Sequence, residues 1–243
     1  MIEVIEGNCF EKNLNKKYAL IITDPPYGQT RNEWDKELNF NLFWEFVDKN
    51  LEKNGVVIIT AMQPFASKII LSRLNWFRTE WIWKKNRPTN HMNADKGPLR
   101  AHENILIFSE NKIYYNPVCY AKRKNVKENR KATNSKNYGR NLSYTDFDLN
   151  KNKHPFSVIA FNVCELKQHP TQKPVNLFQY LISSYSKPGD WILDPFAGAG
   201  TTGMACKRIE RNATLIEMNA EYCNIIKKNI EDDEHEKQTT EQS

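Results

Sequence analysis

Short apolar runs alternate along the chain with segments whose apolar residues recur every three or four positions. Runs rich in valine and isoleucine predict buried strands, whereas the second pattern predicts helices that bury one face. The predicted strands are 1–7, 18–24, 56–60, 79–85, 103–110, 191–196 and 213–218. The predicted helices are 40–55, 64–75, 174–189, 201–211 and 220–230. This alternation predicts a mostly parallel sheet covered by helices on both faces.

The segment 40–55 also carries a predicted helix end. Its apolar residues follow helical spacing from Phe40 to Leu51, and polar residues come next. Gly55 then stands where we expect a glycine just beyond the last helical turn, because glycine adopts the left-handed conformation found there.

Two stretches lack this patterning. Polar and basic residues dominate 116–155, where no strand or helix is predicted. The residues after Ile230 are mostly acidic and polar, so the sequence predicts a frayed tail over 231–243.

The bulk composition fits a single catalytic domain over 1–243. Of the 243 residues, 40% are hydrophobic and 12% are aromatic, enough for a sizeable core. No apolar run approaches the roughly 20 residues that cross a bilayer, and the N-terminus does not resemble a signal peptide. The five cysteines are scattered and never form a C-x-x-C pair. We therefore predict a cytoplasmic protein with no metal site, no disulfide framework and no membrane contact.

The positive charge is concentrated in one stretch. The net charge is +6, but 116–155 alone holds ten Lys or Arg against three acids, or +7, so the rest of the chain is at −1. Such a concentration is typical of a surface that binds a polyanion. A solvated loop is the alternative interpretation of the same composition.

The predicted strand 18–24 ends in an unusual turn, TDPPYG. Pro25 and Pro26 cannot donate to a sheet ladder, so we expect the strand to end at Asp24. Asp24 and Tyr27 would then stand at the carboxyl edge of the sheet, where ligands of open α/β folds bind. A simple strand-ending turn would leave the same pattern.

A second motif, LDPFAGAGTTG at 193–203, lies between a predicted strand and a predicted helix. Gly198, Gly200 and Gly203 satisfy G-x-G-x-x-G, and Glu217 ends the next strand. This arrangement suits a dinucleotide, with the acid on the ribose, but it suits S-adenosylmethionine equally well. Tight strand-to-helix packing is the third interpretation.

The first motif favours methyl transfer to an amino group. The lone pair of an exocyclic base amine is delocalised into the ring, so the nitrogen must become more tetrahedral before it attacks a methyl group. Asp24 and the carbonyl of Pro25 are suitable acceptors for its two N–H groups. Tyr27 could stack on a base flipped out of the duplex. Dehydrogenases need no such motif.

Three motifs together resemble the β-class DNA amino-methyltransferases, which methylate adenine N6 or cytosine N4. They are DPPYG at 24–28, HPTQKP at 169–174 and DPFAGAGTT at 194–202. Their order is that of the β class, with the amine motif before the cofactor loop. Glutamine methyltransferases place a related N-P-P-Y motif after that loop, so the order argues against them.

The resemblance implies a seven-stranded, mostly parallel methyltransferase (Rossmann-like) sheet with an inserted target-recognition region at about 112–160. It implies S-adenosylmethionine-dependent methylation of adenine N6 in double-stranded DNA, because Asp at the first motif position favours adenine and Ser favours cytosine. N4-cytosine methylation is the nearest alternative. A catalytically silent DNA-binding protein is an alternative of another class, and a dehydrogenase is a third. A homodimer and a separate cognate restriction enzyme are compatible with the resemblance.

The predicted site residues fall into three sets. The catalytic set is Asp24, Pro25, Pro26 and Tyr27. The cofactor set is Asn8, Cys9, Asp24, Thr171, Lys173, Asp194, Phe196, Gly198, Gly200, Thr201 and Glu217. The DNA-binding set is Trp34, Lys84, Lys85, Arg87, Lys122, Arg123, Lys124, Arg130, Lys131 and Arg140.

Within the cofactor set, the resemblance places Phe196 against the adenine, Glu217 on the ribose, and Thr171 and Lys173 near the methionine end. Asn8 departs from the family, which usually carries Asp there. Asn still accepts a hydrogen bond, so we expect a weaker or rearranged contact to the cofactor adenine.

Overall fold

A computed structural model of the protein describes residues 1–28, 37–118, 134–135, 139–140, 154–163 and 172–240. The contacts divide the chain into two units. The first consists of Met1–Asn116 and Ser157–Ser243, and the second is Pro117–Phe156.

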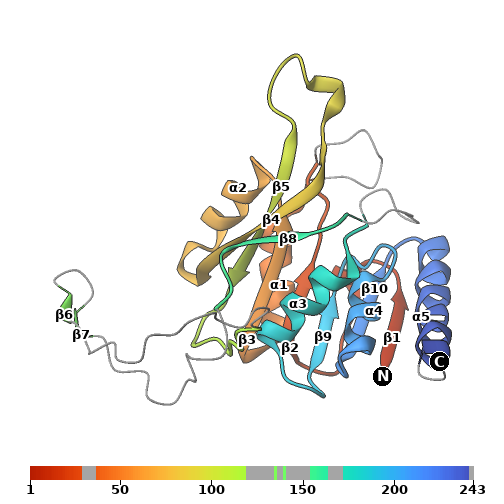
Figure 1. Ribbon diagram of the computed structural model, residues 1–243. Helices are drawn as coiled ribbons and strands as arrows, with labels where there is room; N and C mark the ends of the chain where they lie inside the picture. The colour runs from red at the N-terminus through yellow and green to blue at the C-terminus, as the bar shows by residue number, and fades with distance from the viewer. Residues whose placement is uncertain (29–36, 119–133, 136–138, 141–153, 164–171, 241–243) are drawn as a thin grey trace, which may run out of the picture. The chain divides into compact units, whose positions relative to one another are not determined.

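The first unit is built on a sheet that has eight strands within the described residues, in the order β1-β10-β9-β2-β3-β5-β4-β8 (Figure 1). The strands are β1 (Ile2–Glu6), β2 (Tyr18–Thr23), β3 (Leu51–Ala61), β4 (Phe77–Thr89), β5 (Arg100–Phe108), β8 (Val158–Phe161), β9 (Trp191–Asp194) and β10 (Asn212–Glu217). Neighbouring strands are parallel except where β5 pairs with β3 and β4. The mostly parallel sheet is confirmed, but the predicted count of seven omits β8, a short strand that pairs in parallel with β4.

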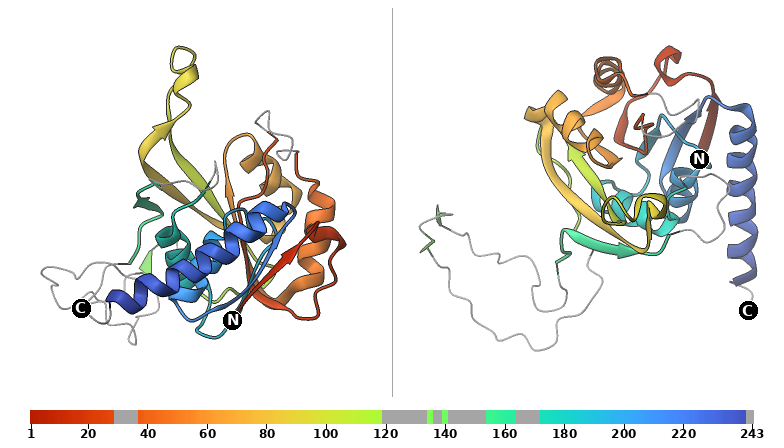
Figure 2. Two further views of the ribbon diagram at one scale, coloured as in Figure 1. Left: turned by 90° about the vertical axis from the view of Figure 1, so that its right-hand side faces the viewer. Right: turned by 90° about the horizontal axis from the view of Figure 1, so that it is seen from above.

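Helices cover both faces of this sheet (Figure 2). The helices are α1 (Phe40–Asn50), α2 (Phe65–Ser72), α3 (Val175–Tyr185), α4 (Thr201–Arg208) and α5 (Ala220–Thr240). Short 3-10 turns are η1 (Cys9–Glu11), η2 (Leu74–Trp76) and η3 (His91–Asn93). Helices α1 and α2 share one core cluster with β2, β3 and β5, whereas α3 and α4 lie on the opposite face. No helix of the described residues is both long and apolar enough to cross a membrane.

Strand β3 shows how strand periodicity fills both layers. Ile58 is fully buried, as are Val57 and Ile59 on either side of it. Val57 and Ile59 belong to the core cluster with α1 and α2, so Ile58 points to the other face. A strand buried on both faces appears in sequence as a continuous apolar run, which is why VVIIT predicts it.

Gly55 does not end a helix. Helix α1 stops at Asn50, and Leu51 already pairs with Tyr18 of β2. Gly55 lies inside β3, where a Cβ atom would come within 2.6 Å of the Leu51 side chain. A close approach inside the strand, rather than a left-handed backbone, therefore requires glycine here.

The tail predicted to fray is helical as far as Thr240. Asp233 is buried, and its carboxylate accepts a hydrogen bond from Nε of Arg208 at 2.8 Å. This partly buried ion pair connects α5 to α4 at a position inside 231–243, the segment that the sequence predicts to fray.

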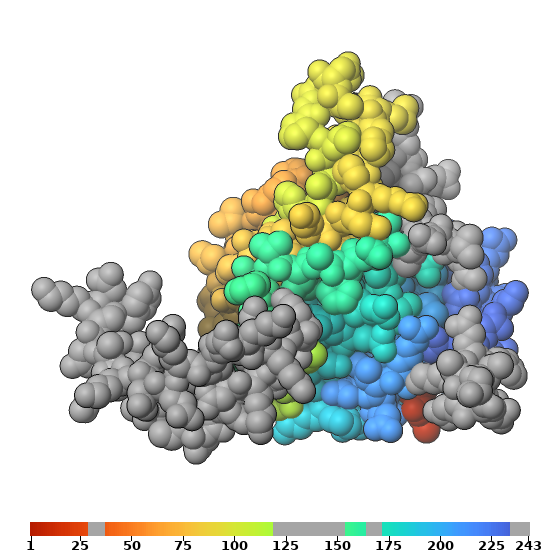
Figure 3. Space-filling model, viewed as in Figure 1, coloured from red at the N-terminus to blue at the C-terminus, as the bar shows by residue number. Residues whose placement is uncertain are grey.

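Strands β4 and β5 form a long hairpin that projects from the first unit (Figure 3). At its tip the Met92 side chain is 95% exposed. Along β4 the side chains alternate, so Trp81, Trp83 and Lys85 are buried on one face.

The second unit contributes one described hairpin. Its strands β6 (Asn134–Ser135) and β7 (Gly139–Arg140) pair antiparallel. The predicted recognition region 112–160 includes this unit, and its role stays a prediction.

Candidate active site

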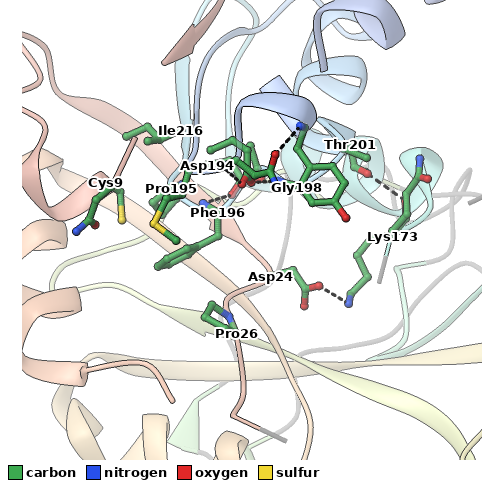
Figure 4. Close-up of a pocket in the computed structure, with 18 of the residues that line it drawn as sticks. Cys9, Asp24, Pro26, Lys173, Asp194, Pro195, Phe196, Gly198, Thr201 and Ile216 are labelled. Carbon is green, nitrogen blue, oxygen red and sulfur yellow. Dashed lines mark hydrogen bonds and ion pairs between the residues drawn. The ribbon is translucent and has the colours of Figure 1, made fainter. Parts of the chain in front are cut away.

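The candidate site lies where three neighbouring parallel strands end. Strands β10, β9 and β2 are adjacent, so their carboxyl ends meet at one edge of the sheet. Glu217 ends β10, Asp194 ends β9, and Asp24 follows β2. All three residues line a pocket of about 420 Å³, a size typical of small-molecule sites (Figure 4).

The pocket brings together most of the predicted cofactor residues. These are Asn8, Cys9, Asp24, Lys173, Asp194, Phe196, Gly198, Thr201 and Glu217, with Pro26 from the catalytic set. Cys9, Phe196 and Ile216 lie toward one end of it, and Asp24 and Lys173 toward the other (Figure 4). Sequence reasoning missed Phe178 and Tyr222, which also line the pocket and which helical spacing alone assigns to the core.

Asp194 fastens the glycine loop to the sheet. Its Oδ1 accepts hydrogen bonds from Oγ1 of Thr23 at 2.8 Å and from the backbone N–H of Phe196 at 3.1 Å. Its Oδ2 accepts from Oγ1 of Thr202 at 2.5 Å. Burial raises the pKa of Asp194 to about 6, against the lowering effect of these three donors. The carboxyl group therefore ties the end of β2, the loop and the start of α4 together.

The loop needs glycine at position 200. Its φ of +83° lies in the left-handed region, and a Cβ atom there would come within 2.9 Å of Cγ2 of Ile226. Gly200 does not itself line the pocket but shapes the turn that does.

Glu217 is oriented by backbone N–H groups. Its Oε2 accepts from Gly198 and its Oε1 from Asn219, both at 2.9 Å. Each carboxylate oxygen can accept two hydrogen bonds, so both retain capacity toward a ligand.

The end of the pocket that holds Cys9, Phe196 and Ile216 is largely apolar. Cys9 is buried there, and burial raises the pKa of its thiol to about 12, so it is a neutral packing group. The ring of Phe196 contacts Phe10 edge-on, with centroids 6.2 Å apart. Asn8 is turned toward its own backbone: Oδ1 accepts from the N–H of Phe10 at 3.2 Å, and Nδ2 donates to Glu11.

At the other end of the pocket, the Asp24 carboxylate accepts hydrogen bonds from three side chains. The hydroxyl groups of Tyr27 and Thr60 both donate to its Oδ1. The ammonium group of Lys173 donates to its Oδ2 at 2.6 Å (Figure 4). The predicted Asp24 motif and the predicted Lys173 thus meet directly, although the chain separates them by 149 residues.

Tyr27 is held by both its hydroxyl and its ring. The ring lies against Phe65, with centroids 5.0 Å apart. Burial and the neighbouring Asp24 raise the pKa of Tyr27 well above its usual value, so it remains a hydrogen-bond donor. Its stacking on a target base stays a prediction.

A buried chain of charges extends from Asp24. Lys173 Nζ also lies 3.3 Å from Oε2 of Glu103, and Glu103 Oε1 lies 2.5 Å from Nζ of Lys85. Burial opposes the charge of Lys173, but Asp24 and Glu103 raise its pKa to about 12. Burial alone would raise the pKa of Glu103, but Lys173 and Lys85 hold it below its usual range. Glu103 and Lys173 are therefore both charged near neutral pH.

This cluster corrects the prediction that Lys85 reaches DNA phosphates. The Lys85 side chain is only 5% exposed, and Glu103 engages its ammonium group. The alternation of Trp81, Trp83 and Lys85 along the strand was the available signal, because it places Lys85 on the buried face. Glu103 itself gave no local signal.

The other predicted DNA contacts are only partly described. Lys84 and Arg87 are exposed on β4, and Arg140 lies in β7. The predicted residues Trp34, Lys122, Arg123, Lys124, Arg130, Lys131 and Thr171 lie outside the described residues. Where side chains are described, no three His, Cys, Asp or Glu residues gather in a way that could hold a metal ion.

A family model described as DNA methylase, covering N6 and N4 enzymes, matches residues 18–228. The type II methyltransferase M.HpaI of Haemophilus parainfluenzae is 31% identical over 90% of this chain and 70% of its own length. The type II methyltransferase M1.MboII of Moraxella bovis is 29% identical over 91% of this chain and 94% of its own.

A solved structure is also similar to this chain in its fold. The M1.HpyAVI–SAM complex is 27% identical in sequence and superposes with a TM-score of 0.63. The match covers 94% of this chain and 100% of the other.

Proposed function

We propose that this chain, which belongs to the family of N6 and N4 DNA methylases, methylates the N6 amino group of adenine in double-stranded DNA. Membership makes the chain a methyltransferase, and the methyl donor of the family is S-adenosylmethionine. The base, the roles of individual residues and the DNA surface are our inferences.

The pocket residues suit that donor. The apolar end, with Cys9, Phe196 and Ile216, fits an adenine ring, and Glu217 can accept hydrogen bonds from ribose hydroxyls. The glycine loop allows the backbone to approach closely at Gly198. S-adenosylmethionine supplies an electrophilic methyl group when bound.

Asp24 is the residue to which we assign the target amine. It lies in the same pocket as the predicted cofactor residues, and this is the observation that carries the proposal. Its Oδ2 would accept one N–H of the amine and the Pro25 carbonyl the other, which draws the lone pair out of the ring. The amine nitrogen gains the methyl carbon as the carbon–sulfur bond breaks, and the proton it loses passes to the Asp24 carboxylate.

The surface that binds DNA follows from charge. Lys84 and Arg87 are exposed on the β4–β5 hairpin, and the basic stretch within 116–155 supplies most of the positive charge of the chain. Phosphate contacts from such residues provide affinity, whereas a few side chains read bases in the groove.

Labelled-methyl transfer tests the function. Wild-type protein, S-adenosylmethionine labelled in its methyl group and duplex DNA should yield labelled N6-methyladenine on nucleoside analysis. N4-methylcytosine would instead support the cytosine alternative, and DNA binding without transfer would support a silent DNA-binding protein.

The matched variants test the role of Asp24. Asp24→Ala should abolish transfer while S-adenosylmethionine binding survives, because Asp24 chiefly holds the amine. Glu45→Ala, which removes an exposed carboxylate from α1, should keep the wild-type rate. Transfer by Asp24→Ala at the wild-type rate would refute the mechanism.

A further inference from the structure

The hydrogen bonds on Asp24 leave one oxygen for a target amine. Oδ1 already accepts from the hydroxyl groups of Tyr27 and Thr60, and a carboxylate oxygen accepts about two hydrogen bonds. Oδ2 accepts from Lys173 at 2.6 Å. An amine that binds Asp24 must therefore use Oδ2, the oxygen that Lys173 holds.

Lys173 has a second acceptor within reach. Its Nζ lies 3.3 Å from Glu103 Oε2, and that buried oxygen accepts no hydrogen bond of good geometry from the residues that the structure describes. A small turn of the ammonium group would convert this longer contact into a hydrogen bond of about 2.7–2.9 Å, the usual length for a charged pair.

Lys85 completes the arrangement. Its Nζ lies 2.5 Å from Oε1 of Glu103, so it holds one carboxylate oxygen and leaves the other, Oε2, to Lys173. The charges then alternate along the series Lys85, Glu103, Lys173 and Asp24 and sum to zero. A buried group of this kind is tolerated because each charge has an opposite neighbour.

We propose that Lys173 holds Asp24 in place and passes its hydrogen bond from Asp24 Oδ2 to Glu103 Oε2 when the target amine binds. Glu103 and Lys85 are positioning residues that act through Lys173. This inference rests on the proposed function for the identity of the amine. The shift leaves Asp24 less neutralised by Lys173, and thus a stronger acceptor, when the amine needs it.

A charge-balanced double variant tests the shift. Lys85→Met/Glu103→Leu removes the second acceptor together with its counterion and leaves the Lys173–Asp24 pair intact, so the buried charge stays at zero. Lys173 then has no acceptor to turn to, and we expect kcat for methyl transfer to fall at least tenfold. The Kd for S-adenosylmethionine should stay within twofold of wild type.

Two further variants separate positioning from structure. Glu103→Gln keeps a neutral acceptor and should fall between wild type and the double variant in kcat. Glu80→Gln removes an exposed carboxylate from β4 and should match wild type. If the cluster were merely structural, the double variant would change the thermal midpoint but keep wild-type kcat, and that result would overturn the inference.

A crystal structure of Asp24→Asn gives an answer that does not depend on activity. With the charge at position 24 removed, Lys173 Nζ should move to hydrogen-bond distance from Glu103 Oε2. An ammonium group that stays on residue 24 would refute the shift. Wild-type protein that transfers no methyl group to DNA would refute the proposed function. The structure of Asp24→Asn would still show whether the ammonium group of Lys173 moves to Glu103.

Discussion

Replacing Asp194 by asparagine should remove a pH dependence of stability that burial of this carboxyl group creates. Asp194 is 4% exposed, and its pKa of about 6 stands against an ordinary value of 3.8. The folded protein therefore holds a proton on Asp194 at pH values where the unfolded chain has released it. This contribution to stability is fully present below about pH 3.8 and is lost as the pH rises through about 6.

The magnitude follows from the two pKa values. Their difference corresponds to about 3 kcal/mol in the free energy of unfolding, since each pKa unit is worth about 1.4 kcal/mol. For a chain of this size, 1 kcal/mol shifts the melting temperature by roughly 2–4 °C. About four fifths of this change falls between pH 4 and pH 7, so the melting temperature of Asp194→Asn, relative to wild type, should rise by roughly 5–10 °C over that interval.

Thermal unfolding followed by circular dichroism at a series of pH values measures this difference. Other buried groups, such as Glu103, titrate in both proteins and cancel in the comparison. Thr202→Val is a matched variant that should have the opposite effect on the pH dependence. It removes a donor that lowers the pKa of Asp194, so this pKa should rise and stability should continue to fall to a higher pH than in wild type. Melting temperatures of wild type and Asp194→Asn that run parallel from pH 4 to pH 7 would refute the reasoning.

Two more predictions concern binding. Glu217→Ala should weaken S-adenosylmethionine binding by about 1–3 kcal/mol, the cost of stranding hydrogen-bonded polar groups, and calorimetry that shows unchanged affinity would refute the assignment. Neutralising Lys122, Arg123 and Lys124 together should weaken binding to all DNA sequences alike and flatten the slope of log affinity against log salt by up to ~2.7, or ~0.9 for each phosphate contact. A triple variant with wild-type affinity and salt slope would mean that these residues do not contact DNA.

The parts of the site that sequence predicts are those that follow apolar runs. Asp24, Asp194 and Glu217 each end a buried run, and adjacent parallel strands place such residues at one edge. A carboxylate at the end of a buried apolar run is therefore visible without coordinates. The turn at Asp24 is confirmed within one residue, since β2 ends at Thr23.

The parts that sequence misses depend on distant contacts. Glu103 belongs to an antiparallel hairpin, and a charged residue in such a strand is usually expected to face solvent. Its burial depends on Lys85 of the other hairpin strand and on Lys173, which lies just before α3. The helix beyond Ile230 is a similar case, because the buried Asp233 pairs with Arg208, which lies 25 residues away in the chain.

The order of strands has a consequence for how this protein can evolve. Strand β2 pairs with β9, with Leu20 beside Ile192. These two strands lie far apart in the sequence, so they can pair only after most of the chain has been made. The stretch between Asn116 and Ser157 belongs to the long segment that connects β2 to β9 in the sequence. Doubling the length of a closed loop costs only ~0.6 kcal/mol in chain entropy. Insertions and deletions there are therefore nearly neutral for the sheet, and a lineage can vary this stretch while Asp24 and Lys173 keep their places.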